Sequence, residues 1–168
     1  MRIYLIGFMG CGKSTTAKKL AAEMNVPVMD VDKRIEEVEG KIVSEIFAMK
    51  GEEYFRKLET SVLQHSTFFD DAIISCGGGT PCFFGNMDWM KKNGLTVYLK
   101  STPEFLFSRL ALKKYKRPLI AHMNDEELLK FIKGKLQERE KFYLQADLIY
   151  QSQGIDIDDL LIKIRKSL

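Results

Sequence analysis

A stretch near the N-terminus, residues 7–14, has the spacing G-x-x-x-x-G-K-S. It follows a short apolar segment, residues 3–6, and precedes a helical pattern over residues 15–24. Glycines let the backbone curl so that successive N–H groups face a phosphate, and the next helix adds partial positive charge at its N-terminus. In such a loop Lys13 would reach the outer phosphates and the Ser14 hydroxyl would ligate Mg²⁺. The motif therefore predicts a nucleoside triphosphate site rather than an ordinary glycine-rich turn.

Two carboxylates, Asp30 and Asp32, stand at and just beyond the end of the next apolar segment, residues 26–31. Alternation along an extended chain places both side chains on the same side. One could hold Mg²⁺, directly or through water, and the other could orient or deprotonate an acceptor hydroxyl. Alone, such a pair more often consists of surface acids that cap the following helix. Because a phosphate-binding motif stands in the same chain, we favour the catalytic interpretation.

Three consecutive glycines, residues 77–79, follow another apolar segment, residues 72–76. Each glycine loses much backbone entropy on folding, and a tight turn requires only one or two of them. A third glycine makes sense where a ligand must approach the main chain closely. We therefore predict that a hydroxylated substrate accepts hydrogen bonds from backbone N–H groups of this turn.

Three arginines are candidates for anion binding. Arg56 suits bidentate recognition of a carboxylate, although composition alone favours a solvated helix arginine paired with nearby glutamates. Arg117 closes a basic tract, residues 113–117, from which it could neutralise charge on a transferring phosphoryl group. Arg139 could reach inward as a second anion anchor, and the alternative is an exposed helix residue balanced by its glutamate neighbours.

The elements that must position these groups alternate between strand and helix. Apolar strands separated by helical segments indicate a parallel sheet with helices on both faces. In such sheets ligands bind beyond the carboxyl ends of the strands, where the phosphate loop, the acid pair and the glycine triplet all fall. The predicted strands are residues 2–8, 26–31, 72–76, 95–100 and 147–151.

Helix signals complete this pattern. Thr102 and the proline after it predict a helix start, and Asn124 with Glu127 predicts a capping box that opens a long helix to about residue 144. The last helix presents one packing face, and an aromatic and methionine stripe is interpreted as core. The packing face comprises Ile157, Leu160, Leu161, Ile164 and Leu168, and the stripe comprises Phe83, Phe84, Met87, Trp89 and Met90.

The length of 168 residues predicts a single domain, residues 1–168, with a core large enough to need no disulfides. Its core would comprise residues 1–31, 67–112 and 124–168. Two stretches between core elements are expected to lie above the site. Residues 32–66 are predicted to bind the substrate, and residues 113–123 are predicted to form a lid.

Composition narrows the class of protein. Hydrophobic residues make up 45% and charged residues 29%, which is typical of an ordinary soluble protein, and the net charge of +3 is too small for nucleic acid or membrane as the main partner. Three cysteines without paired spacing argue against disulfides and zinc and suit a reducing cytoplasm. Cys11, inside the phosphate loop, is interpreted as a small filling residue rather than a reactive thiol. We expect a cytoplasmic monomer.

In this order, the motifs resemble those of shikimate kinases from residue 3 to about residue 150. The resemblance implies the P-loop fold of the nucleoside-monophosphate-kinase type, an α/β fold with a five-stranded parallel sheet flanked by helices. It also implies phosphorylation of the shikimate 3-hydroxyl by ATP with Mg²⁺, within aromatic amino-acid biosynthesis. The shared motifs are residues 6–14, Asp30-x-Asp32, Ile46-Phe47, Phe55-Arg56-x-x-Glu59, residues 77–79, Arg117-Pro118-Leu119 and Arg139.

The resemblance assigns one set of residues to ATP and the metal ion. Lys13 would bind the β- and γ-phosphates, Arg117 would come from the lid to the reacting phosphates, and Arg109 is the candidate adenine contact. Ser14 would ligate Mg²⁺, and Asp30 would support the metal through water. The remaining nucleotide contacts would come from Gly10, Cys11, Gly12 and Thr15.

A second set is assigned to shikimate. Asp32 would bind its hydroxyls and is the candidate base, while Arg56 and Arg139 would hold its carboxylate. Backbone N–H groups of Gly79 and of Gly78 would face the substrate. The pocket would be lined by the rings of Phe47 and Phe55.

Two other function classes stay open at this point. Another small-molecule kinase of the same fold, such as a gluconate or nucleoside monophosphate kinase, would share the phosphate loop. Two arginines and an acid pair suit an acceptor with a carboxylate and vicinal hydroxyls, which disfavours a nucleotide acceptor. A nucleotide-binding regulatory module would hydrolyse its nucleotide slowly and independently of any metabolite.

Overall fold

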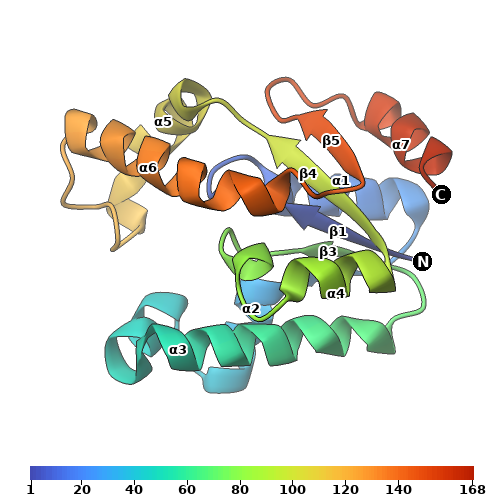
Figure 1. Ribbon diagram of the computed structural model, residues 1–168, viewed down its shortest axis with the longest axis horizontal. Helices are drawn as coiled ribbons and strands as arrows, with labels where there is room; N and C mark the ends of the chain where they lie inside the picture. The colour runs from blue at the N-terminus through green and yellow to red at the C-terminus, as the bar shows by residue number, and fades with distance from the viewer.

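The computed structural model describes all residues, 1–168, and its centre is a parallel sheet of five strands in the order β2-β3-β1-β4-β5. Figure 1 shows the sheet with helices on both faces, which confirms the predicted α/β architecture. All five predicted strands are present, and several end earlier than predicted because their last residues already turn into loops. The strands are β1 Arg2–Ile6, β2 Val28–Asp30, β3 Ala72–Ser75, β4 Leu95–Lys100 and β5 Leu148–Gln151.

Seven α-helices connect and cover the strands. In Figure 1, α4 and α6 cover the near face of the sheet, while α1 lies behind it against β3 and α7. Their bounds are α1 Lys13–Met24, α2 Val31–Glu39, α3 Val43–Gln64, α4 Asn86–Asn93, α5 Pro103–Ala111, α6 Asp125–Tyr143 and α7 Ile157–Lys166. Short 3₁₀ turns occupy His65–Phe68, Thr80–Cys82 and Lys114–Lys116. No helix has the length and apolar character that a membrane span requires.

The predicted helix starts are confirmed by their hydrogen bonds. The Thr102 side chain accepts from the backbone N–H of Phe105 at the start of α5. At the start of α6, Asn124 and Glu127 each accept from the other's backbone N–H, at 2.8 Å in both directions. These caps satisfy N–H groups that the first helical turn leaves without partners.

The register of the sheet explains why the chemical motifs meet. β1 is the central strand, and its residues Ile3 to Ile6 are fully buried. Leu5 is paired with Ser75 on β3, and Asp30 on β2 is also paired with Ser75. Parallel strands in this register end at one edge of the sheet, so the loops that follow β1, β2 and β3 lie side by side.

Two packing predictions are wrong in part. Leu168 lies beyond the end of α7 and is 63% exposed, whereas Leu160, Leu161 and Ile164 are buried as predicted. The aromatic and methionine stripe also divides between core and surface. Met87 and Met90 are buried in the core, but Phe84 is 58% exposed. The reason is local: Phe84 has a positive φ of 49°, and Gly85, the N-cap of α4, also has a positive φ, so the chain turns outward there.

Candidate active site

The phosphate loop leads from β1 into α1, and two of its backbone N–H groups have no partner in the protein. Gly12 has φ 99° and caps α1, a left-handed conformation that glycine adopts without a steric penalty. Within the loop the Cys11 N–H bonds to the Phe8 carbonyl, while the N–H groups of Gly10 and Gly12 have no partner in the protein. The free amides and the N-terminus of α1 favour an anion at this point.

Lys13 supplies the fixed positive charge of the loop. Its side chain is buried, and its ammonium donates to the carbonyl oxygens of Gly7 at 2.8 Å and Phe8 at 2.9 Å. Cys11 is 1% exposed and its sulfur lies 3.8 Å from the Lys13 nitrogen. The thiol therefore fills the space beneath the loop, as predicted from the sequence.

Asp30 caps the helix that follows it, which is the surface-acid alternative that the sequence left open. Its Oδ1 accepts from the Lys33 N–H and so caps α2, and its Oδ2 accepts from the Ser14 hydroxyl at 2.8 Å. The hydroxyl of Ser75 lies 3.4 Å from that of Ser14. No group of three or more His, Cys, Asp or Glu side chains is arranged to hold a metal ion. Ser14 and Asp30 nonetheless fit Mg²⁺, which is commonly held by one or two protein oxygens and completes its shell with phosphates and water.

Asp32 lies in the first turn of α2 and faces other acids. Burial raises the pKa of its carboxyl to about 6, and the charges of Glu59 and Asp30 act in the same direction, while Lys13 opposes them. A carboxylate whose pKa lies close to neutrality is suited to accept a proton from a substrate hydroxyl.

Arg56 is buried rather than solvated, so the interpretation favoured by composition alone is wrong in this respect. The residue is 7% exposed, and its guanidinium donates to Glu59 at 2.9 Å and to the more exposed Glu52 at 3.4 Å. The ring of Phe83 covers it, with the guanidinium carbon 4.3 Å from the ring centroid. Phe83 therefore packs over Arg56 and is not the core residue that was predicted.

The rings of Phe47 and Phe55 also lie beside Arg56. Their ring centroids lie 4.3 Å apart, and the Arg56 guanidinium carbon lies 5.7 Å from the first and 5.2 Å from the second. Both rings come from α3, which contains a break at Gly51 with φ 79° and ψ 171°. Aromatic faces beside a guanidinium restrict where a ligand can approach it.

The three glycines are required by the side chains that crowd them. A Cβ at Gly79 would lie 2.5 Å from Arg56 Nη1, and one at Gly78 would lie 3.1 Å from Arg139 Nη1. A Cβ at Gly77 would lie 2.9 Å from both an Asp32 and a Glu59 oxygen. The backbone N–H groups of all three glycines have no partner in the protein. The triplet therefore lets charged side chains approach the backbone and leaves donors free for a ligand.

Arg139 reaches the same turn from α6. Its side chain is partly buried, so the exposed-helix alternative is wrong, and its guanidinium carbon lies 5.6 Å from the Phe8 ring centroid. Arg56 and Arg139 thus approach the glycine turn from α3 and α6, two elements that lie far apart in the sequence.

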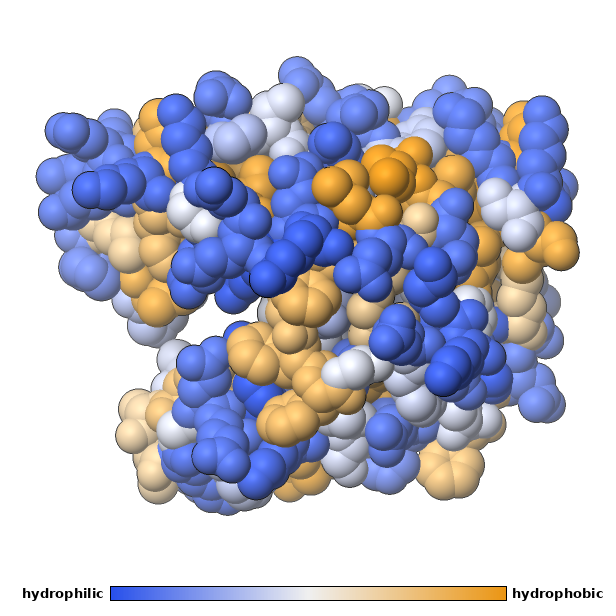
Figure 2. Space-filling view, in the orientation of Figure 1, coloured by the Kyte–Doolittle hydropathy of each residue, from blue (hydrophilic) through white to orange (hydrophobic).

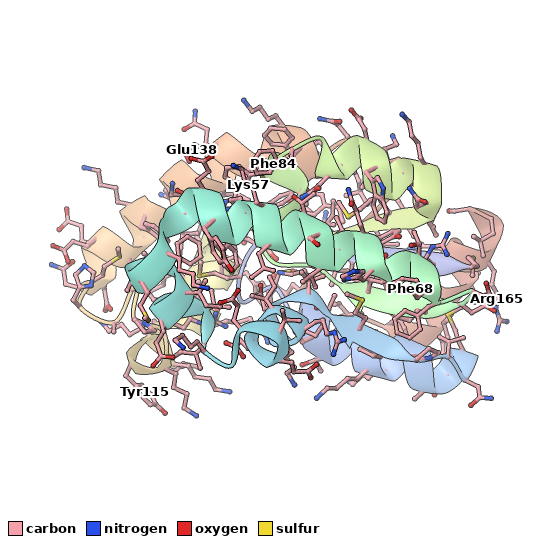
Figure 3. The ribbon with its side chains drawn as sticks, turned by 90° about the horizontal axis from the view of Figure 1, so that it is seen from below. Lys57, Phe68, Phe84, Tyr115, Glu138 and Arg165 are labelled. Carbon is pink, nitrogen blue, oxygen red and sulfur yellow. The ribbon has the colours of Figure 1, made fainter.

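Most of the predicted site residues line one cavity of about 240 Å³. Figure 2 shows the molecule hollowed between the segment that carries α2 and α3 and the part that carries α5 and α6. Arg117 comes from the exposed segment after α5, where Tyr115 projects from the surface in Figure 3. Predicted residues in the cavity wall are Gly10, Gly12, Lys13, Ser14, Thr15, Asp30, Asp32, Gly78, Arg109 and Arg117.

Sequence reasoning gave no site role to Thr80 or Phe83, and it named Glu59 only as a motif residue and as a nearby glutamate that could pair with Arg56. Glu59 is fully buried and does pair with Arg56, at the helical spacing of three residues. Thr80 donates to Glu59 at 2.6 Å, and Phe83 covers Arg56. Nothing in the local pattern around Thr80 or Phe83 indicates these contacts, because they depend on how the turn packs against α3.

Known proteins were found that are similar to this chain over nearly its whole length. The family model described as shikimate kinase matches residues 9–167. A shikimate kinase of Bacteroides fragilis is 46% identical over 156 residues, which is 93% of this chain and 87% of that protein. The crystal structure of shikimate kinase from Bacteroides thetaiotaomicron has a TM-score of 0.92 at 40% identity, covering 99% of this chain and 97% of the other.

A further solved structure contains a ligand. Shikimate kinase from Acinetobacter baumannii, in complex with shikimate, has a TM-score of 0.84 at 31% identity and covers 98% of this chain and 90% of its own. Sequence, fold and site geometry therefore agree with the resemblance that the motifs suggested. The chain belongs to the shikimate kinase family.

Proposed function

We propose that this chain transfers the terminal phosphoryl group of ATP to the 3-hydroxyl of shikimate and so forms shikimate 3-phosphate for aromatic amino-acid biosynthesis. Membership of the shikimate kinase family supports both the reaction and ATP as the co-substrate. One structural observation carries the proposal. An acid of raised pKa and a turn with free N–H groups line the cavity beside the phosphate loop, and a buried arginine approaches the same turn at Gly79.

The phosphate loop and Arg117 would bind the ATP phosphates. The free amides of Gly10 and Gly12 and the ammonium of Lys13 offer donors to the β- and γ-phosphates. Arg117, from the lid segment, would neutralise the charge that spreads over the transferring group, and Arg109 would contact the nucleotide farther from the reaction centre. Positioning and charge neutralisation supply most of the catalysis in phosphoryl transfer.

Shikimate would lie beside the glycine turn, near Arg56 and Arg139. Arg56 and Arg139 would pair with its carboxylate, and the N–H groups of Gly78 and Gly79 would donate to its hydroxyls. Phe47 and Phe55 would line the pocket beside Arg56. A carboxylate bound at one end of the ring leaves a hydroxyl at the other end directed toward the phosphates.

Asp32 would orient the 3-hydroxyl and accept its proton. A pKa of about 6 leaves the carboxylate mostly ionised at neutral pH, and it remains basic enough to take a proton as the new O–P bond forms. The transfer is direct and in line, so no covalent enzyme intermediate is expected. Ser14 and Asp30 would hold Mg²⁺, which would act as a Lewis acid and withdraw charge from the phosphates.

The two segments above the site would have different roles. Residues 32–66, which form most of α2 and all of α3, would bind the acceptor, and residues 113–123 would form the lid. Ile120 is fully buried, and the Lys114 ammonium donates to the Met123 carbonyl at 2.7 Å, so the lid is tied together at its base. We also propose a monomer in the cytoplasm, where the free thiols suit the reducing conditions.

The proposal is tested by measuring ADP formation with shikimate, gluconate or AMP as the acceptor, each with and without Mg²⁺. We expect ADP to form with shikimate and Mg²⁺ only, and ³¹P NMR to identify the 3-phosphate. Faster turnover with gluconate or AMP would contradict the acceptor assignment. ADP formation that no acceptor accelerates would instead indicate a nucleotide-binding module.

A further inference from the structure

Thr80 follows the glycine triplet and is completely buried. Its hydroxyl lies 2.6 Å from Glu59 Oε1. Its backbone is held on both sides, because its N–H donates to the Gly77 carbonyl at 3.1 Å and its carbonyl accepts from the Asn86 side chain at 2.9 Å. The hydroxyl is therefore a donor at a fixed position, set by the same turn that presents the glycine N–H groups.

The two oxygens of Glu59 have different neighbours. Oε2 accepts from the Arg56 guanidinium at 2.9 Å. Oε1 accepts from Thr80. Oε1 and an oxygen of Asp32 both lie close to Gly77, because a Cβ built on Gly77 would be 2.9 Å from each of them. The negative charges of Glu59 and Asp32 therefore repel each other. The Thr80 hydroxyl supplies the hydrogen bond that Oε1 needs on this side.

We infer that the Thr80 hydroxyl is a positioning group for the acceptor site, which fixes the Glu59 carboxylate and through it the direction of the Arg56 guanidinium. The inference rests on the proposed function, in which Arg56 binds the shikimate carboxylate. Thr80 itself is fully buried, and it bonds to one oxygen of Glu59 while Arg56 bonds to the other. It acts on the substrate only through that pair.

The other ion pair of Arg56 is weak. Its second partner, Glu52, lies 3.4 Å away, and the Glu52 side chain is 59% exposed. Exposed ion pairs contribute little to holding a geometry, because water screens them and their side chains keep their freedom. Without the Thr80 donor, Glu59 would lose its hydrogen bond on the Asp32 side and would be free to rotate, and the guanidinium would turn with it.

The test compares three variants in steady-state kinetics. Thr80→Val keeps the shape and removes the donor, and Thr80→Ser keeps the hydroxyl. Thr60→Val is the matched control, because the Thr60 hydroxyl donates to the Arg56 backbone carbonyl and accepts from Asn86 but does not contact the Glu59 carboxylate. We expect Thr80→Val to raise the KM for shikimate roughly tenfold, with kcat and the KM for ATP changed less than about twofold. Thr80→Ser should restore the KM, and Thr60→Val should leave it unchanged.

Two further measurements separate positioning from general damage. Shikimate methyl ester has no carboxylate charge for Arg56 to bind, so Thr80→Val should not weaken its binding. In a Glu59→Gln background, Thr80→Val should add almost nothing, since the two residues act through one contact. This background also provides the test if Thr80→Val alone folds poorly, because the buried charge is gone.

The outcomes are distinct. An unchanged KM for shikimate in Thr80→Val, a failure of Thr80→Ser to restore it, or an equal loss with the methyl ester would overturn the role of Thr80 while leaving the proposed function intact. No shikimate-dependent ADP formation in the unaltered enzyme would overturn the proposed function and the inference with it. Loss of kcat and of ATP binding together would show a structural effect and would also overturn the inference.

Discussion

The hydroxyl of Tyr143 donates a hydrogen bond to the backbone carbonyl of Gly78. Tyr143 is fully buried at the end of α6, and its ring packs against Tyr98 with centroids 5.0 Å apart. The Gly78 carbonyl and the Gly79 N–H belong to the same planar peptide unit. The tyrosine therefore fixes the direction of the N–H group that we propose faces the acceptor.

Replacing Tyr143 by Phe should weaken acceptor binding without unfolding the protein. The phenyl ring preserves the packing against Tyr98, while the Gly78 carbonyl loses its partner and the peptide can rotate. We expect the KM for shikimate to rise about three- to tenfold, which corresponds to a net hydrogen bond of about 1 kcal/mol. Steady-state kinetics with each substrate varied in turn measures this, and an equal rise in the KM for ATP would contradict the assignment.

A methyl group at Gly79 should close the acceptor site. The added Cβ would lie 2.5 Å from the Arg56 guanidinium and would displace it. We expect Gly79→Ala to raise the KM for shikimate at least a hundredfold while ATP binding, measured by calorimetry, stays close to normal. The matched control is Gly134→Ala in α6, where a Cβ meets nothing within 4 Å. It should leave turnover unchanged and increase the free energy of unfolding by about 0.5–1 kcal/mol.

Asp32 should make the free enzyme less stable as the pH rises through the acid range. The pKa of its carboxyl is about 6 in the folded protein against 3.8 for the ordinary group, so the folded state binds the proton more tightly. The resulting penalty is absent below pH 3.8 and complete above pH 6. At pH 7, Asp32→Asn should therefore increase the unfolding free energy by about 2 kcal/mol.

Urea denaturation at pH 4 and pH 7, without nucleotide or metal, measures this difference. The gain in Asp32→Asn should be present at pH 7 and mostly lost at pH 4, and a gain of the same size at both values would refute the raised pKa. The same variant should bind ATP and fail to transfer the phosphoryl group. Near-normal turnover would exclude Asp32 as the base.

Arg117 should matter for turnover and not for stability. It is exposed in the lid segment and lines the cavity, so its removal leaves no buried gap. We expect Arg117→Ala to lower kcat by about 10²- to 10³-fold, in the range seen when one charge-stabilising group is removed. The control is Lys116→Ala, which removes a neighbouring exposed charge that does not line the cavity. An equal loss in both variants would indicate a general electrostatic effect.

The sequence by itself determined the fold class of this protein and the positions of most of its strands and helices. Apolar segments joined by helices specified a parallel sheet, and the motif at residues 7–14 predicted what its first loop binds. The caps at Thr102 and Asn124 were readable because the residues that form them lie within three positions of each other. The predicted roles of Lys13, Arg117 and the other site residues remain proposals that the variants above test.

Tertiary structure decided which charged residues are buried and what each of them contacts. Arg56 has the local sequence of a solvated helix arginine, and only the packing of α3 against the glycine turn and Phe83 excludes water from it. Phe83 packs over Arg56 instead of joining the predicted core, and Leu168 lies exposed beyond the end of α7. Contacts such as Thr80 with Glu59 join residues far apart in the chain, so no local pattern can specify them.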